Sequence, residues 1–149
     1  MPITKEEEEE FEKNSYILNQ LKSNLEALMQ QREMFSAAHM DVQKAFESLE
    51  NLEGQKGKPE LMVPIGGDCF INAKSEDVKK VVVGIGGNIF IEKPVSEAKE
   101  VLENRLKMIN ENAQRIGSNI QEMELKAQTM SQRNQEIYAK AQEGLQPQQ

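Results

Sequence analysis

Apolar residues recur with heptad spacing along two long stretches of the chain, and these stretches flank a short, strongly apolar middle. Two apolar columns in each stretch form one narrow seam, which predicts a coiled-coil helix over residues 4–54 and a second over residues 96–143. The columns are Leu21, Leu28, Phe35, Val42 and Leu49 with Phe11, Leu18, Leu25, Arg32, His39 and Phe46, then Leu102, Ile109, Ile116, Met123, Met130 and Ile137 with Leu106, Ala113, Ile120, Ala127, Asn134 and Ala141.

The first helix has recognisable signals at both ends. Thr4 followed by Glu7 is a capping-box pattern, and Gly54 is suited to the position just after the last helical turn. Arg32 and His39 interrupt the apolar seam midway. Because a polar seam residue fixes register at a cost in stability, we interpret both as specificity devices and not as ligands or catalytic groups.

The second helix is bounded by capping and breaking residues. Ser96 is expected to cap its start, while Gly144 and Pro147 are expected to end it. Residues 144–149 are therefore predicted to form a disordered tail.

The apolar middle is an internal repeat. A shift of twenty positions places Val63–Ile71 on Val83–Ile91, with most residues identical. Each copy has two apolar runs split by Gly-Gly-Asp or Gly-Gly-Asn, which predicts two successive β-hairpins within residues 60–93. The returning strands are apolar on both faces, so strands of other copies or partner chains must cover them. The predicted assembly residues are Val63, Ile65, Phe70, Ile71, Val83, Ile85, Phe90 and Ile91.

These elements predict one domain spanning residues 1–149, of the α+β class and predominantly α. Because the hairpins return the chain to where it left, the two helices should pack as a long antiparallel coiled-coil hairpin with the β-hairpins at the joined end. Leu49 should then lie near Leu102, and Leu18 near Met130.

Composition restricts the function. The formal charge of −7 argues against binding to nucleic acid or to an anionic membrane. There is no apolar run long enough for a membrane span and no signal-peptide pattern at the start, so we expect a cytoplasmic protein. One cysteine and one histidine do not make a zinc pattern. Residues Gly84–Ile89 begin like a dinucleotide-binding fingerprint, but the turn of the repeat explains their glycines. We therefore expect no cofactor, no metal and no enzymatic activity.

Several apolar side chains lie off the heptad columns and are not needed by the seam. Two interpretations remain open: ordinary exposed apolar residues, or an adaptable binding surface like those of promiscuous binders. The residues off the columns are Ile3, Ile17, Met29, Met34, Met40 and Tyr138, and the predicted free ends also hold Phe11, Met130, Ile137 and Leu145.

The motifs VPIGGDCFI and VVVGIGGNIFIEK, placed between two coiled-coil helices, resemble the α class of prefoldin subunits, which has two hairpins where the β class has one. They resemble archaeal members more than eukaryotic ones. The resemblance implies a heterohexamer of two α and four β subunits whose strands join into a β-barrel. It also implies ATP-independent capture of non-native proteins at the helix tips and their delivery to a group II chaperonin.

On this sequence the tips correspond to about residues 3–18 and 130–145. The expected client-binding residues are Phe11, Ile17, Leu18, Met130, Ile137 and Tyr138. The alternative is a coiled-coil scaffold or assembly protein that binds one dedicated partner and has no chaperone activity.

Overall fold

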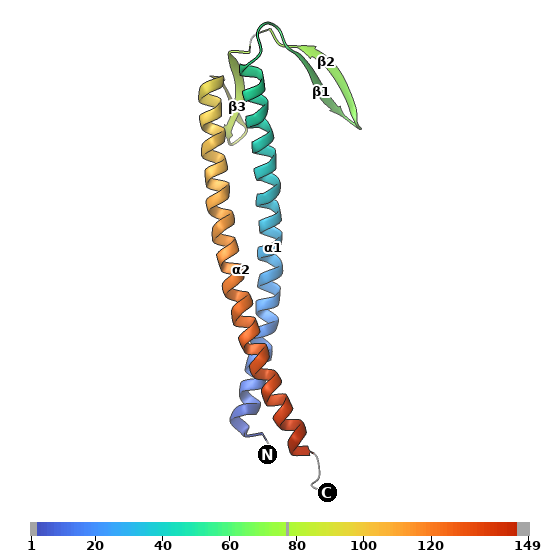
Figure 1. Ribbon diagram of the computed structural model, residues 1–149, viewed down its shortest axis with the longest axis vertical. Helices are drawn as coiled ribbons and strands as arrows, with labels where there is room; N and C mark the ends of the chain where they lie inside the picture. Colours follow the sequence, from blue (N-terminus) through green and yellow to red (C-terminus); the bar gives the residue numbers. More distant parts are fainter. Residues whose placement is uncertain (1–2, 77, 146–149) are drawn as a thin grey trace. The chain divides into compact units, whose positions relative to one another are not determined.

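The computed structural model describes residues 3–76 and 78–145, and within them it has two helices and four strands (Figure 1). It divides into two compact units: a terminal unit, residues 1–36 and 112–149, and a hairpin unit, residues 37–111. Each unit contains part of both helices and is described by itself. In chain order the elements are α1 (Lys5–Glu53), β1 (Glu60–Gly66), β2 (Cys69–Lys74), β3 (Lys80–Gly86), β4 (Ile89–Pro94) and α2 (Val95–Leu145).

Helix α1 begins at the predicted capping box. The Thr4 amide donates to Glu7 Oε2 at 3.1 Å, and the Glu7 amide donates to Thr4 Oγ1 at 3.2 Å. The helix ends one residue before Gly54, whose amide donates to the Glu50 carbonyl at 3.4 Å. Gly54 does not have a positive φ. In the segment between α1 and β1, the residue with a positive φ is Gly57, at 104°. The predicted end of the helix is therefore confirmed without a left-handed glycine cap.

Helix α2 is longer at both ends than predicted. It starts at Val95, directly after β4, so Ser96 lies inside its first turn and the prediction that Ser96 caps it is wrong. The Val95 amide donates instead to the carbonyl of Lys79 at 3.1 Å. This hydrogen bond joins the first residue of α2 to the residue that precedes β3. At the other end the helix continues through Gly144 to Leu145, because a single helical glycine costs only about 1 kcal/mol relative to alanine. The rest of the predicted tail, residues 146–149, lies outside the described residues.

In the terminal unit, α1 and α2 run antiparallel around a narrow seam (Figure 1). Leu21, Ile116, Ile120 and Ile137 are buried there, and all four belong to the predicted heptad columns. Arg32, the polar interruption predicted in this part of α1, is exposed, so its charge does not enter the seam.

In the hairpin unit, the two helices are also antiparallel. Lys99 of α2 forms ion pairs with Glu53 at 3.0 Å and Glu50 at 3.8 Å, and its Nζ lies 5.5 Å from the centre of the Phe46 ring. The Glu53 hydrogen bond raises the pKa of Lys99. These contacts lie at the level where Leu49 and Leu102 were expected to meet. His39, the second polar interruption, is half-buried in this unit.

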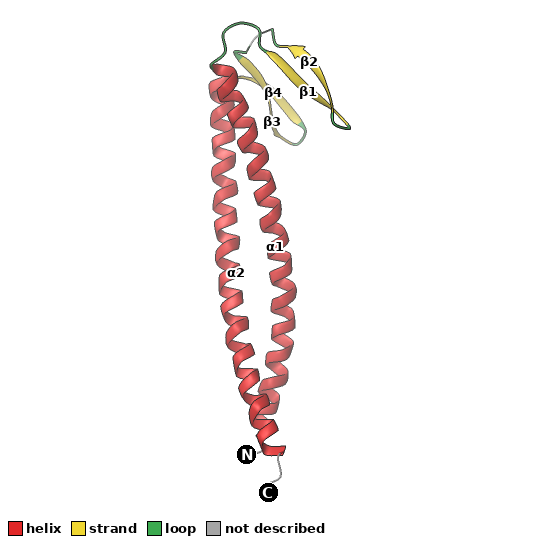
Figure 2. Ribbon diagram, turned by 45° about the vertical axis from the view of Figure 1, so that its right-hand side comes forward, coloured by secondary structure: helices red, strands yellow, loops and turns green. Residues whose placement is uncertain are grey.

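The strands form two separate two-stranded antiparallel sheets, β1–β2 and β3–β4 (Figure 2). Gly67 and Asp68 have φ of 58° and 57°, and Gly87 and Asn88 match them at 57° and 58°. Positive φ at both central residues is what a two-residue type I′ hairpin turn requires, which explains the Gly-Asp and Gly-Asn pairs. The predicted hairpins are confirmed.

Each hairpin also contains a β-bulge that the sequence pattern did not predict. Pro64 pairs with Phe70 but Gly66 pairs with Cys69, so Ile65 is an extra residue; Ile85 is its equivalent in the second hairpin. A bulge bends the strand and breaks its simple alternation. Ile65 and Ile85 therefore do not follow the regular alternation of their strands.

Candidate functional site

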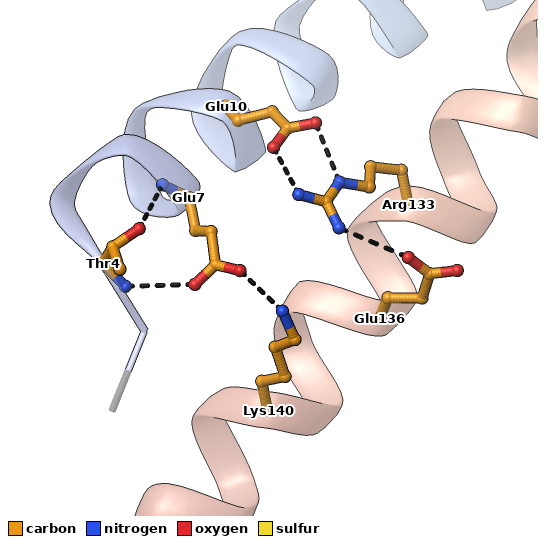
Figure 3. Close-up of polar contacts among 6 residues, drawn as sticks. All are labelled: Thr4, Glu7, Glu10, Arg133, Glu136 and Lys140. Carbon is orange, nitrogen blue, oxygen red and sulfur yellow. Dashed lines mark hydrogen bonds and ion pairs between the residues drawn. The ribbon is translucent and has the colours of Figure 1, made fainter. Parts of the chain in front are cut away.

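The site begins with the ion pairs that join the first turns of α1 to the last turns of α2 (Figure 3). Arg133 binds Glu10 in a bidentate manner, with Nε and Nη2 each 2.9 Å from a carboxylate oxygen, and its Nη1 lies 3.4 Å from Glu136. Lys140 reaches Glu7 at 2.8 Å. A planar guanidinium with two parallel hydrogen bonds fixes both distance and orientation. We call Glu7, Glu10, Arg133 and Lys140 the terminal clasp.

The clasp changes the acidity of its members. The hydrogen bond from Lys140, followed by that from the Thr4 amide, lowers the pKa of Glu7. The hydrogen bond from Arg133 lowers the pKa of Glu10, and the same bond raises the pKa of the Arg133 guanidinium. Each carboxylate is therefore held in its charged form.

A polar layer crosses the apolar seam beside the clasp. Asn14 and Asn134 are both buried at heptad positions. The Asn134 Nδ2 donates to Ser15 Oγ at 3.1 Å and to the Phe11 carbonyl at 3.4 Å, while Ser15 Oγ donates to the same carbonyl at 2.7 Å. The Asn134 Oδ1 is buried and finds no hydrogen-bond partner among the described residues. Polar seam residues of this kind favour one register over others.

On one side of the polar layer lies a small pocket of about 280 Å³, which we call the acid-rimmed pocket. Its wall combines apolar side chains of α1 and α2 with two carboxylates of α1. Tyr138 is 58% exposed at its edge, whereas Ile137 is only 1% exposed. The lining residues are Ile3, Glu8, Phe11, Glu12, Ile137, Tyr138 and Ala141.

On the other side of the layer is a larger and more open groove of about 580 Å³, which we call the mid-helix groove. Its apolar residues are Leu18, Leu25, Met29 and Ala127. Ala127 is small, and a small residue at a heptad position leaves apolar surface on the facing helix uncovered. The groove is completed by Asn19, Lys22, Glu26, Gln128 and Ser131.

The structure places the six predicted client-binding residues in different surroundings. Phe11 and Tyr138 line the acid-rimmed pocket, and Leu18 lines the mid-helix groove. Ile17 and Met130 are half-buried and line neither hollow. Ile137 touches the pocket but is almost fully buried, because it occupies a heptad position and packs in the seam. It is a supporting residue in this conformation and not an accessible contact.

The predicted assembly residues are mostly exposed, with a difference between the two hairpins. In the first hairpin Val63, Ile65, Phe70 and Ile71 are all exposed. In the second hairpin Ile85 and Phe90 are exposed, Ile91 is half-buried and Val83 is buried.

Val83 lies beside a hydrogen bond that joins β3 to α2. An Arg105 nitrogen donates to the carbonyl of Gly84, which fixes α2 against β3. Val83 is 8% exposed, whereas its repeat equivalent Val63 is 39% exposed. In this conformation Val83, a predicted assembly residue, is therefore not accessible to partner strands.

The residues that the sequence did not indicate share one feature: each lines a hollow that is formed together with side chains of the other helix. Glu8, Glu12 and Ala141 line the acid-rimmed pocket, and Leu25 and Ala127 line the mid-helix groove. The heptad pattern could have indicated Ala127, since a small residue at that position predicts poor filling of the seam. Nothing in the sequence distinguishes Glu8 and Glu12 from the other carboxylates near the start of α1.

Other classes of site find little support in the part of the chain that the structure describes. Within residues 3–76 and 78–145, no cluster of three or more histidine, cysteine or carboxylate side chains is arranged to hold a metal ion. Over the same ranges, neither helix offers a stretch that is both apolar and long enough to cross a membrane. Cys69 is an exposed free thiol in β2.

Comparison with known proteins gives a consistent result. Residues 21–140 match the family model described as prefoldin subunit. The chain is 31% identical to prefoldin subunit alpha of Methanocorpusculum labreanum over 124 residues, covering 83% of this chain and 84% of that protein. It is 30% identical to prefoldin subunit alpha of Pyrococcus horikoshii over 132 residues, covering 88% and 89%.

A solved structure shares the fold. It is a chain from the cryo-EM structure of filamentous PFD from Methanocaldococcus jannaschii, with a TM-score of 0.67 and 22% identity over 78% of this chain and 96% of that one. Two hairpins between paired helices and the identity to alpha subunits over most of the chain agree with each other. The chain therefore belongs to the prefoldin family, as an alpha subunit.

Proposed function

We propose that this chain captures segments of non-native proteins in the two apolar hollows of its terminal unit, and that it does so as one subunit of a prefoldin complex. Prefoldin subunits are non-enzymatic chaperones, and an alpha subunit works in a complex with beta subunits. The composition of two alpha with four beta subunits, capture without ATP, delivery to a group II chaperonin and a cytoplasmic location are parts of this proposal.

The observation that carries the proposal is the pair of hollows on either side of the polar layer. The acid-rimmed pocket and the mid-helix groove both present apolar side chains that the helix pair leaves open to a ligand. Both are small and open, so each contact with an unfolded chain is weak. Several weak contacts made at once by several subunits give a much higher overall affinity, and release then needs no hydrolysis.

Assembly is proposed to use the strands. Met62, Ile65 and Phe70 of the first hairpin, with Val82 and Phe90 of the second, are large apolar side chains that remain more than half exposed. Two-stranded hairpins with such surfaces are marginal in water by themselves. Pairing with strands of other subunits into a barrel would cover these surfaces and remove the free edges.

The test combines Phe11→Ser with Tyr138→Ser in a complex reconstituted with beta subunits. Two unrelated denatured proteins are diluted into this complex, and light scattering measures their aggregation. We expect the variant to lose suppression of both, because it removes the two aromatic walls of the acid-rimmed pocket. Tyr16→Ser is the matched control, since Tyr16 is an exposed aromatic of α1 that lines neither hollow.

Native mass spectrometry of each variant establishes that the complex still assembles. Unchanged suppression by an assembled Phe11→Ser, Tyr138→Ser complex would contradict the capture site. Wild-type complex that ignores both denatured proteins but binds one native partner would instead favour the scaffold function.

A further inference from the structure

The acid-rimmed pocket carries two carboxylates that have no partner among the residues that the structure describes. Glu8 and Glu12 both line it, one helical turn apart, so both lie on the same face of α1. Within residues 3–76 and 78–145 neither side chain forms a hydrogen bond or an ion pair. Two like charges at this spacing repel each other slightly, and a cation placed between them would relieve the repulsion.

Among the described residues, the basic side chains of this region are either paired with other carboxylates or do not line the pocket. Arg133 is bound to Glu10 and Glu136, and Lys140 is bound to Glu7. The other basic residues of this α1 segment, Lys5 and Lys13, do not line the pocket. The hollow is therefore apolar inside and negative at its rim, with no cation of its own among the described lining residues.

We propose that this pocket selects apolar side chains that have a lysine or arginine beside them in the client sequence. A volume of about 280 Å³ lies at the lower end of ligand-pocket sizes, so it suits one large side chain and not a folded surface. The apolar side chain contacts Phe11 and Tyr138, and the neighbouring cation meets Glu8 and Glu12. The inference rests on the proposed function and adds the substrate class to it.

The experiment uses three short unstructured peptides and the assembled complex. All three contain one central phenylalanine, which is flanked on both sides by lysine, by glutamine or by glutamate, with glycine and serine elsewhere. Fluorescence anisotropy measures their binding. Exposed charge pairs contribute about 0.2–1 kcal/mol each, so we expect the lysine peptide to bind roughly three- to tenfold more tightly than the glutamine peptide. The glutamate peptide should bind most weakly.

The decisive variant is Glu8→Gln with Glu12→Gln, which should bring the lysine peptide to the affinity of the glutamine peptide. The matched control is Glu6→Gln with Glu9→Gln, which removes the same charge from the same helix but from residues that do not line the pocket. It should retain most of the preference. Raising the salt concentration should weaken only the lysine preference, because exposed charges are screened.

Three results would overturn the inference while leaving the proposed function standing. These are equal binding of the lysine and glutamine peptides, a preference that survives Glu8→Gln with Glu12→Gln, and a preference lost equally in the control. If no peptide binds while aggregation suppression still depends on Phe11 and Tyr138, the single-side-chain occupant is refuted. If neither binding nor suppression depends on these two residues, the proposed function itself fails.

Discussion

Replacing Asn134 with leucine should stabilise the terminal unit. Asn134 is 9% exposed in the seam, and its Oδ1 is buried without a partner among the described residues. An unsatisfied buried acceptor costs about 1–3 kcal/mol, and this penalty disappears in the variant. Burial of the leucine side chain adds about 1.5–3 kcal/mol relative to its exposure.

Two terms oppose this gain. The variant loses one hydrogen bond of ordinary length to Ser15 and one long one to the Phe11 carbonyl, together about 1–2 kcal/mol. Fitting a leucine into a site shaped for asparagine costs about 1–2 kcal/mol in strain. Ser15 stays satisfied, because its hydroxyl still donates to the Phe11 carbonyl at 2.7 Å. The net expectation is a stabilisation of about 1–2 kcal/mol.

Native-state hydrogen exchange on the assembled complex is the appropriate measurement, because it reports opening of one segment at a time. Amides of α2 near position 134 should exchange about 5- to 30-fold more slowly in the variant. Amides near Lys99 in the hairpin unit serve as an internal reference and should not change. Asn134→Ala is the matched control: it removes the same polar groups without filling the space, so it should not slow exchange. Equal or faster exchange in Asn134→Leu would refute the reasoning and assign the polar layer a net stabilising role.

Two further predictions concern the clasp and the strands. Glu7 and Glu10 have lowered pKa values in the folded chain. Their contribution to the free energy of unfolding is therefore fully present above the ordinary pKa of 4.5 and is lost as the pH falls through the lowered values. Circular dichroism should therefore show a larger loss of helix on acidification below about pH 4.5 in the wild type than in Glu7→Gln with Glu10→Gln, and identical acid profiles would contradict a stabilising clasp. Ile71→Asp with Val82→Asp should prevent assembly with beta subunits, since burying each carboxylate costs several kcal/mol. Native mass spectrometry tests this against Asn72→Asp with Asn88→Asp, which adds the same charge at positions already polar, and an intact complex in the first variant would exclude the barrel role.

Local patterns were sufficient for the secondary structure. Heptad columns predicted both helices, and Thr4 with Glu7 predicted the first residue of α1. The Gly-Gly-Asp and Gly-Gly-Asn turns predicted both hairpins, because positive φ at two successive residues is a property of the turn itself. The same middle segment carried the resemblance to the family. In each case the controlling interaction lies within a few residues along the chain.

Where prediction failed locally, a contact from another element decided the outcome. Ser96 is a good capping residue, but the bond from the Val95 amide to the Lys79 carbonyl sets the start of α2. Ile65 fits an alternating strand pattern, but the pairing of Gly66 with Cys69 makes it a bulge residue.

The sequence by itself determined the helices, the hairpins and the family, since periodicity and turn chemistry act over short distances. It also presents the two repeat copies as equivalents. Only the tertiary structure separates Val63 from Val83: Val83 is buried beside the Gly84 carbonyl that Arg105 of α2 binds, whereas Val63 is exposed. Only the antiparallel pairing of the helices brings Glu8 and Phe11 into one pocket with Tyr138, which lies more than a hundred positions later in the chain. Burial and charge at such a site depend on which side chains meet across the two helices, and the order of residues along one chain does not contain that information.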